Sequence, residues 1–183
     1  CRVDFGGTLD ISTFFLPLHF LSPSSFNIAL DLRTAVSLSP WQKGSIKVSS
    51  KGFESAVFKK DAVSVHHPMG LVFACANYFD AHGVHIQIES ASPPRSALGG
   101  SSAAAVAIVS AFYKVLDKPI EPRRIAWLAH YIEASVAGVP CGMQDQLAAA
   151  FGGVNQWFWK MGKISPEFDQ VPVFENTNDI KAF

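Results

Sequence analysis

The spacing of hydrophobic and polar residues changes about one third of the way along the chain. Before residue 60, short β-rich or alternating segments are separated by the turn sequences GG, SPSS and PWQKG. The segments are RVDF (2–5), FNIALDLRTAVSLS (26–39) and SIKVSS (45–50). We therefore expect strands over residues 1–60, with residues 26–39 forming one bent strand or two.

After residue 64 the pattern becomes mostly helical. In residues 67–83, Leu71, Val72, Cys75, Tyr78 and Phe79 have the spacing of one helix face, and the segment ends at a glycine. In VHIQIES (84–90), Val84, Ile86 and Ile88 alternate with polar residues, which predicts a strand with these three side chains inward. Further helices are expected over 101–116, 119–138 and 141–153, then a strand over 154–159 and at most one more. This order favours an α+β sandwich over a regular βαβ winding.

Composition narrows the function classes. The 183 residues fit one domain, and 15 Lys and Arg balance 15 Asp and Glu, so no basic excess favours nucleic acid or an anionic membrane. The longest apolar run, 103–112, is too short for a membrane span. Three cysteines without metal-ligand spacing indicate reduced thiols in a cytoplasmic protein, with Cys75 and Cys141 filling the core. The oligomeric state stays open.

Two further clusters are interpreted as structural. His66 and His67 precede a proline and have no metal-ligand partner at useful spacing, so we expect both to be exposed to solvent. Trp157, Phe158 and Trp159 are expected to pack in the core and at its edge.

Candidate chemistry begins with the segment PPRSALGGSSAAA (93–105), which runs into a helix. A glycine-rich turn before a helix presents unpaired N–H groups and the positive end of the helix dipole, a combination that binds anions. The segment is neither GxxxxGK[ST] nor GxGxxG. On glycine content alone, an ordinary serine-capped helix explains it equally well.

Three segments together resemble the GHMP kinase superfamily, which includes galactokinase, homoserine kinase and mevalonate kinase. RVDFGGTLDI is similar to the family's first motif, PPRSALGGSSAAA to the second, and PCGMQDQLAAAFGGVN to the segment that carries the catalytic aspartate in sugar kinases. The last form is most similar to D-glycero-D-manno-heptose 7-phosphate kinases. The resemblance implies the ribosomal protein S5 domain 2-like α+β fold, with a mixed sheet packed against helices. It also implies an ATP-binding domain over residues 1–160, while 161–183 begin the connection to a C-terminal domain.

The resemblance also implies ligands for ATP and Mg²⁺. The residues expected around the ATP phosphates are Pro94, Leu98, Gly99, Gly100, Ser101, Ser102 and Ala103. Mg²⁺ would be held by Ser101 or Ser102 and by Glu133, whose carboxylate is a hard oxygen ligand. The alternatives are a plain helix cap for each serine and a solvated helix carboxylate for Glu133.

For the reaction itself, the resemblance assigns Asp145 as the catalytic base and Arg2 as the cation that stabilises charge beside it. Asp10 would hydrogen-bond the hydroxyls of the sugar, and Gln144 is a further substrate contact. Without the resemblance, Asp145 would more often be a helix cap. Arg2 and Asp10 could instead be surface residues at a strand end, and Arg2 stands close enough to the chain start for disorder.

The resulting expectation is an ATP-dependent kinase that acts on a sugar or a sugar phosphate, such as heptose 7-phosphate or a fucose-like sugar. The alternatives are a kinase for a small non-sugar alcohol and a non-catalytic module that binds a nucleotide or a sugar. Ala97 stands where the family usually has glycine, which would strain the loop if its φ is positive. Since no third glycine-rich motif follows Asn155, we expect weak or no turnover from this chain alone.

Overall fold

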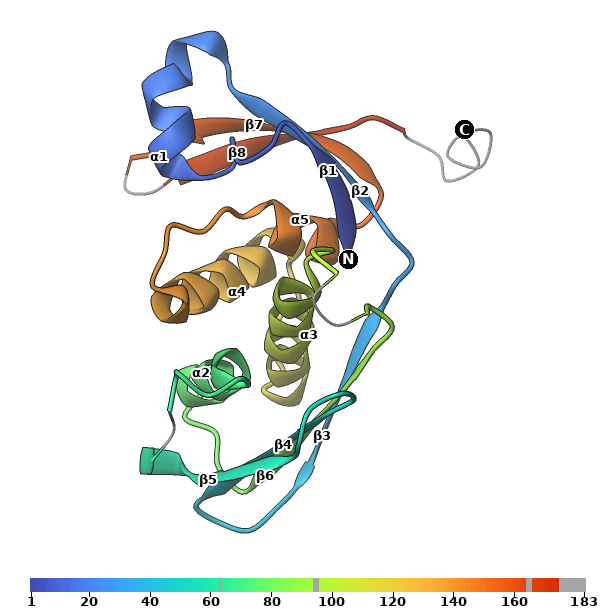
Figure 1. The fold of residues 1–183 in the computed structure, drawn as a ribbon, viewed down its shortest axis with the longest axis vertical. Helices are drawn as coiled ribbons and strands as arrows, with labels where there is room; N and C mark the ends of the chain where they lie inside the picture. Colours follow the sequence, from blue (N-terminus) through green and yellow to red (C-terminus); the bar gives the residue numbers. More distant parts are fainter. Residues whose placement is uncertain (63, 94–95, 164–165, 175–183) are drawn as a thin grey trace.

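The protein, seen in a computed structural model, contains two β-sheets with helices between them (Figure 1). The structure describes residues 1–62, 64–93, 96–163 and 166–174, with only the backbone of Asp61 and Pro166. The sheets lie at the two ends of the molecule's long axis, and helices α2 to α5 fill the space between them. The α+β class is confirmed.

The first sheet has the strand order β1-β2-β7-β8, and every neighbouring pair is antiparallel. Its strands are β1 (Arg2–Phe5), β2 (Ser24–Ala29), β7 (Val154–Met161) and β8 (Pro166–Pro172). Strand β2, from the N-terminal part of the chain, therefore pairs with β7 after α5, and β1, which carries the start of the first motif, lies on the other side of β2.

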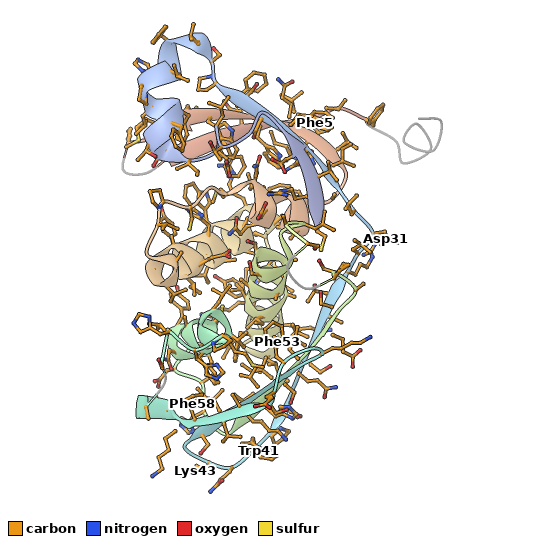
Figure 2. The ribbon with its side chains drawn as sticks, viewed as in Figure 1. Phe5, Asp31, Trp41, Lys43, Phe53 and Phe58 are labelled. Atoms are coloured by element: carbon orange, nitrogen blue, oxygen red, sulfur yellow. The ribbon has the colours of Figure 1, made fainter. Side chains whose placement is uncertain are left out.

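The second sheet is mixed, as the resemblance implied. Its order is β3-β6-β4-β5, in which β4 and β6 run parallel while the other pairs are antiparallel. Its strands are β3 (Thr34–Pro40), β4 (Ser45–Ser50), β5 (Ala56–Lys59) and β6 (Val84–Ser90). Residues 26–39 thus form two strands that belong to different sheets, and Figure 2 shows Asp31 on the connection between them.

Helices form where they were expected, and the described residues contain three short helical turns in addition. The longer helices are α2 (Gly70–Tyr78), α3 (Gly100–Val115), α4 (Pro122–Ala137) and α5 (Gln144–Phe151). Short helical turns are α1 (Ser12–Phe15), η1 (Leu16–Leu21) and η2 (Lys60–Ala62). The prediction of strands throughout residues 1–60 is therefore wrong at 12–21. Phe15 there is fully buried against Trp159, so tertiary packing holds a helical turn in a segment without helical periodicity.

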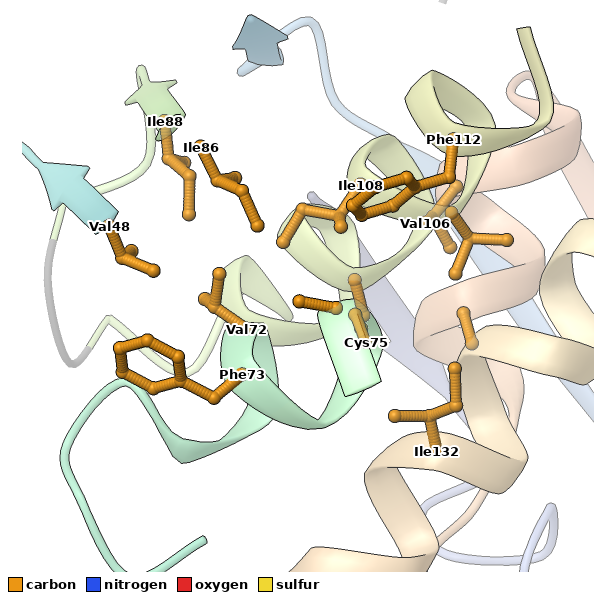
Figure 3. Close-up of a cluster of buried hydrophobic side chains, with 14 of the residues drawn as sticks. Val48, Val72, Phe73, Cys75, Ile86, Ile88, Val106, Ile108, Phe112 and Ile132 are labelled. Atoms are coloured by element: carbon orange, nitrogen blue, oxygen red, sulfur yellow. The ribbon is translucent and has the colours of Figure 1, made fainter. Parts of the chain in front are cut away.

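One hydrophobic core lies between α2, α3, α4 and the second sheet. Ile86 and Val48 point from the strands toward Val72 and Ile108 on the helices (Figure 3). Ile86 and Ile88 are inward as predicted, and Cys75 is fully buried. The predicted face of α2 is wrong at Tyr78, which is 59% exposed, because Phe73 and Ala76 are the residues that face the core.

A second core lies under the first sheet. Trp157 and Trp159 are buried there with Phe15 and Phe168, which confirms the packing role predicted for the tryptophans. Phe168 belongs to β8 and packs edge-on against Trp157, with ring centres 5.3 Å apart. Leu9 of the first motif also packs against this core.

The burial of Cys141, His66 and His67 tests what the sequence predicted for each of them. Cys141 is only partly buried and therefore does not fill the core. His66 is exposed, but His67 is half-buried because its ring packs edge-on against Phe58 and Phe73 and its Nδ1 accepts the N–H of Met69. No helix among the described residues is long and apolar enough to cross a membrane.

Candidate active site

The glycine-rich loop ends at the start of α3, and its backbone has the geometry of an anion site. Gly99 is the N-cap residue, with a left-handed backbone (φ 72°) that glycine adopts without steric cost. The first helical hydrogen bond runs from the N–H of Ala103 to the Gly99 carbonyl at 2.9 Å. The N–H groups of Gly100, Ser101 and Ser102 therefore have no carbonyl partner within the helix, while that of Ala103 is already used.

The hydroxyls of Ser101 and Ser102 do not cap α3. Both donate to Glu133 on α4, Ser101 to Oε1 at 3.1 Å and Ser102 to Oε2 at 2.7 Å. Gln146 on α5 donates its amide to the same Oε2 at 2.6 Å. The cap interpretation of the two serines and the solvated interpretation of Glu133 are therefore both wrong, because the carboxylate is half-buried and joins three helices.

Arg2 connects β1, the loop and α5. Its backbone N–H donates to the Leu98 carbonyl at 3.0 Å, and its Nη1 donates to the Ala97 carbonyl at 3.1 Å. Its Nε lies 2.5 Å from Oδ1 of Asp145, and its Nη1 lies 2.8 Å from Oδ1 of Asp4. Arg2 is therefore ordered within β1, with a side chain that is only 15% exposed.

Asp145 lies in the first turn of α5 and directly against the loop. A Cβ added to Gly99 would come within 3.0 Å of the Asp145 carboxyl carbon, so a residue with a side chain there would crowd the carboxylate. The N-cap of α5 is Met143 and has no side-chain cap hydrogen bond, so Asp145 is not the cap. Burial raises the pKa of Asp145, and the neighbouring Arg2 guanidinium opposes that increase.

Asp10 and Gln144 are buried beside Asp145. Gln144 is 5% exposed and donates its side-chain amide to Asp4 Oδ2 at 3.0 Å and to the Gly7 carbonyl at 3.2 Å. Asp10 is 8% exposed, and its Oδ2 accepts the backbone N–H of Gln144 at 3.1 Å. Burial raises the pKa of Asp10, while hydrogen bonds from backbone N–H groups act in the opposite direction.

The structure therefore brings most of the predicted site residues together at one place. Leu98, Gly99, Gly100, Ser101 and Ser102 form the loop and helix start, with Arg2, Glu133 and Asp145 around them. Pro94 lies outside the described residues. In Figure 1 the site lies where α3 and α5 approach the start of β1.

Two residues of the site were missed from the sequence. Asp4 stands two positions after Arg2 on the same face of β1, so strand alternation could have identified it as a partner of Arg2. Gln146 gave no such signal, because its role depends on α4 presenting Glu133 to α5.

The residues present fit a nucleotide phosphate and Mg²⁺. Gln146 is 2% exposed, and its Oε1 has no hydrogen-bond partner in the described part of the chain. The described residues contain no group of three His, Cys, Asp or Glu side chains that could hold a metal. One carboxylate with hydroxyl oxygens suits Mg²⁺, which commonly takes one or two carboxylates together with phosphate oxygens and waters.

Ala97 has a left-handed backbone with φ 58°, which is strained for a residue with a Cβ. Ala97→Gly is therefore expected to leave the free energy of unfolding unchanged or to raise it by up to about 1 kcal/mol, since glycine's greater freedom in the unfolded chain offsets part of the relieved strain. Urea unfolding measures the change. Ala104→Gly, inside α3, is the matched control and should cost about 1 kcal/mol. Equal destabilisation by both variants would mean that position 97 carries no strain.

Comparison with known proteins finds one matching family model. Residues 69–153, which include the loop, Glu133 and Asp145, match the GHMP kinases N terminal domain. A D-glycero-alpha-D-manno-heptose 7-phosphate kinase of Campylobacter jejuni is 46% identical over 63 residues, which are 34% of this chain and 19% of that protein. A mevalonate kinase of Pyrococcus abyssi is 30% identical over 165 residues, which cover 80% of this chain and 47% of that protein. The chain thus spans about half the length, or less, of these relatives.

Solved structures share the fold. A D-glycero-D-manno-heptose 1-phosphate kinase from Bacteroides thetaiotaomicron superposes with a TM-score of 0.77 at 21% identity, covering 98% of this chain and 60% of that one. The mevalonate kinase of Methanococcus jannaschii superposes with a TM-score of 0.68 at 14% identity, covering 93% and 55%. The matched segment and the shared fold make this chain similar to the N-terminal domain of GHMP kinases.

Proposed function

We propose that this chain binds ATP and Mg²⁺ at the start of α3, and that the protein to which it belongs transfers phosphate to a hydroxyl of a sugar or sugar phosphate. The observation that carries the proposal is the position of Asp145. Its carboxylate lies where a side chain at Gly99 would extend and pairs with Arg2, so a proton acceptor and a fixed cation stand beside the anion site of the loop.

The helix start would bind the phosphates. The N–H groups of Gly100, Ser101 and Ser102 lie at the N-terminal end of a 16-residue helix and point away from it. The helix dipole also favours negative charge at this end. Arg2 donates hydrogen bonds to the Leu98 and Ala97 carbonyls. These bonds keep the loop in one conformation before a ligand binds. A loop that is fixed in advance loses less entropy on binding.

Glu133, with Ser101 and Ser102, would hold the metal. When bound, Mg²⁺ and ATP supply the phosphoryl group and neutralise part of its charge. The protein sets the orientation of the Glu133 carboxylate, because Gln146 and Ser102 both donate to its Oε2. Among the described residues, Oε1 accepts a hydrogen bond only from the more exposed Ser101, so Oε1 is the oxygen best placed to face a cation.

Asp145 would accept the proton of the acceptor hydroxyl. Burial raises its pKa, which makes the carboxylate a stronger base than an exposed aspartate, while Arg2 keeps it ionised near neutral pH. The guanidinium also reduces repulsion between this carboxylate and a phosphate bound at the loop. Asp4 anchors Arg2 from the other side.

The acceptor is proposed to be a sugar or a sugar phosphate. This choice is supported by the QDQ segment and by the 46% identity to a heptose 7-phosphate kinase over 63 residues. A small non-sugar alcohol is the second candidate, which the match to a mevalonate kinase over 80% of this chain favours. Turnover assays of the full-length protein with heptose phosphates, fucose and mevalonate would discriminate between them. Binding of ATP without turnover of any acceptor would favour a non-catalytic module.

Nucleotide binding is tested on this chain by calorimetric titration with ATP in the presence and absence of Mg²⁺. Glu133→Gln is expected to weaken binding of Mg²⁺ and ATP by about tenfold or more, because the metal loses its charged ligand, while binding of ATP without metal changes little. Glu54→Gln, which removes the same charge from an exposed loop, is the matched control. If Glu133→Gln binds Mg²⁺ and ATP as tightly as the wild type does, Glu133 is not the metal ligand.

A further inference from the structure

Arg2 and the first turn of α5 share a second carboxylate, that of Asp4 on β1. The Asp4 side chain is 21% exposed and its two oxygens have different partners: Oδ1 lies 2.8 Å from Arg2 Nη1, and Oδ2 accepts the side-chain N–H of Gln144 at 3.0 Å. Gln144 is the first residue of α5, and Asp145 is the second. We propose that Asp4 is a positioning residue, which holds the Arg2 guanidinium so that it pairs with one oxygen of Asp145 and leaves the other oxygen available to accept a proton. This inference rests on the function proposed above, in which Asp145 is the base.

The nitrogens of the Arg2 guanidinium are divided between different partners. Nε lies 2.5 Å from Asp145 Oδ1, while Nη1 lies beside Asp4 and also donates to the Ala97 carbonyl at 3.1 Å. In the part of the chain that the structure describes, Asp145 is contacted by Nε and not by either Nη atom. The two acceptors on Nη1 therefore fix the rotation of the guanidinium plane, which keeps the contact with the base at a single nitrogen.

The pairing of β1 with β2 holds Asp4 in this place. Arg2 and Asp4 are two positions apart on β1, so the pleat of the strand puts both side chains on one face. Asn27 on β2 stands opposite Asp4, and its side-chain amide donates to the Gln144 carbonyl at 3.1 Å. The two strands therefore hold the first residue of α5 both at its side chain and at its backbone, and Asp145 follows directly on the helix.

The two oxygens of Asp145 have different surroundings. Oδ1 is buried against Arg2, whereas Oδ2 has no partner among the described residues and would lie 3.1 Å from a Cβ added to Gly99 of the loop. A guanidinium and a carboxylate favour two parallel N–H···O bonds when nothing competes for the nitrogens. Such a pairing would engage Oδ2 and make it a weaker proton acceptor. Asp4 competes for the guanidinium and thereby keeps Oδ2 available.

The charge of Asp4 acts in the same direction as its geometry. Burial raises the pKa of Asp145, the Arg2 guanidinium lowers it, and the Asp4 carboxylate raises it. The other charged groups near the base are the Cys1 amino group, which lowers its pKa, Asp10, and Glu133, which is bonded to Gln146 on the same helix. Of the carboxylates other than Asp145 in this set, Asp4 is the one that contacts Arg2 in the described part of the chain.

Two measurements on this chain test the proposal without depending on catalysis. In Asp4→Asn, a nearly isosteric change that removes the charge, NMR titration of the Asp145 carboxyl carbon is expected to show a lower pKa than in the wild type. A crystal structure of the same variant is expected to show Arg2 in contact with both oxygens of Asp145. Asp169→Asn, which neutralises an exposed carboxylate on β8, is the matched control and should change neither. An unchanged pKa of Asp145, or an Arg2 that still contacts one oxygen alone, would overturn the proposal.

Kinetics of the full-length protein show whether this positioning affects turnover. Asp4→Asn is expected to lower kcat at neutral pH roughly tenfold, because Arg2 then engages the oxygen that should accept the proton. The acidic limb of kcat/KM should move to lower pH, the direction opposite to that expected when Arg2 itself is removed. A limb that stays in place, whether or not kcat falls, would indicate a merely structural role and refute the proposal. If the wild type shows no turnover with any acceptor, the proposed function fails, while the titration and the crystal structure still decide the role of Asp4.

Discussion

Asp145→Asn in the full-length protein is expected to lower kcat by roughly 100- to 10,000-fold, the usual contribution of a general base. Asparagine has nearly the same shape but accepts no proton, so the acceptor hydroxyl must attack without assistance. Binding of ATP should change by less than about threefold, since the loop N–H groups and Glu133 are untouched and Arg2 keeps its contacts with Asp4 and Ala97. Steady-state kinetics and calorimetry measure the two quantities separately.

The pH profile of the wild type provides an independent check on this base. Burial raises the pKa of Asp145, so the acidic limb of kcat/KM should lie above the ordinary value for aspartate. Arg2→Met removes the cation that opposes this increase and should move the limb to still higher pH. Asp169→Asn should leave both kcat and the limb unchanged. An Asp145→Asn enzyme with more than about a tenth of wild-type kcat would exclude Asp145 as the base.

Phe73→Ala is expected to lower the free energy of unfolding by about 3–5 kcal/mol, the cost of removing a buried phenyl ring and leaving a cavity. Phe73 has no exposed surface and packs edge-on against Phe58, with ring centres 4.9 Å apart. Domains of this size have a total stability of only about 5–15 kcal/mol, so the variant would lose a large part of it. Urea unfolding followed by circular dichroism measures the change.

Tyr78→Ala on the same helix is the matched control. Its ring is 59% exposed and contacts Phe79, so its loss should cost about 1 kcal/mol or less. The comparison tests whether Phe73, and not the predicted Tyr78, contributes to the core. If Tyr78→Ala proved as damaging as Phe73→Ala, the assignment of the core to the Phe73 face would be wrong.

Local sequence signals predicted the elements wherever periodicity and turn residues agreed. The strand over 84–90 was found with its inward residues Ile86 and Ile88, and α3 to α5 were found within a few residues. The signal failed at residues 12–21, which form helical turns because Phe15 is buried under the first sheet. On α2, the predicted residues Val72 and Cys75 are buried, but packing against the second sheet also buries Phe73 and leaves Tyr78 exposed.

The sequence by itself determined the resemblance to GHMP kinases and the residue types at the site, because a glycine loop before a helix and a QDQ segment are short-range patterns. It could not decide whether Ser101 and Ser102 cap a helix or contact Glu133, since both uses need the same hydroxyls. Only the tertiary structure brought β1, α4 and α5 together around the loop, which made Arg2 and Gln146 the partners of Asp145 and Glu133. It also placed the Asp10 carboxylate against the backbone of α5. These contacts join residues more than ten positions apart, so they depend on how the strands pair and the helices pack, which no local pattern specifies.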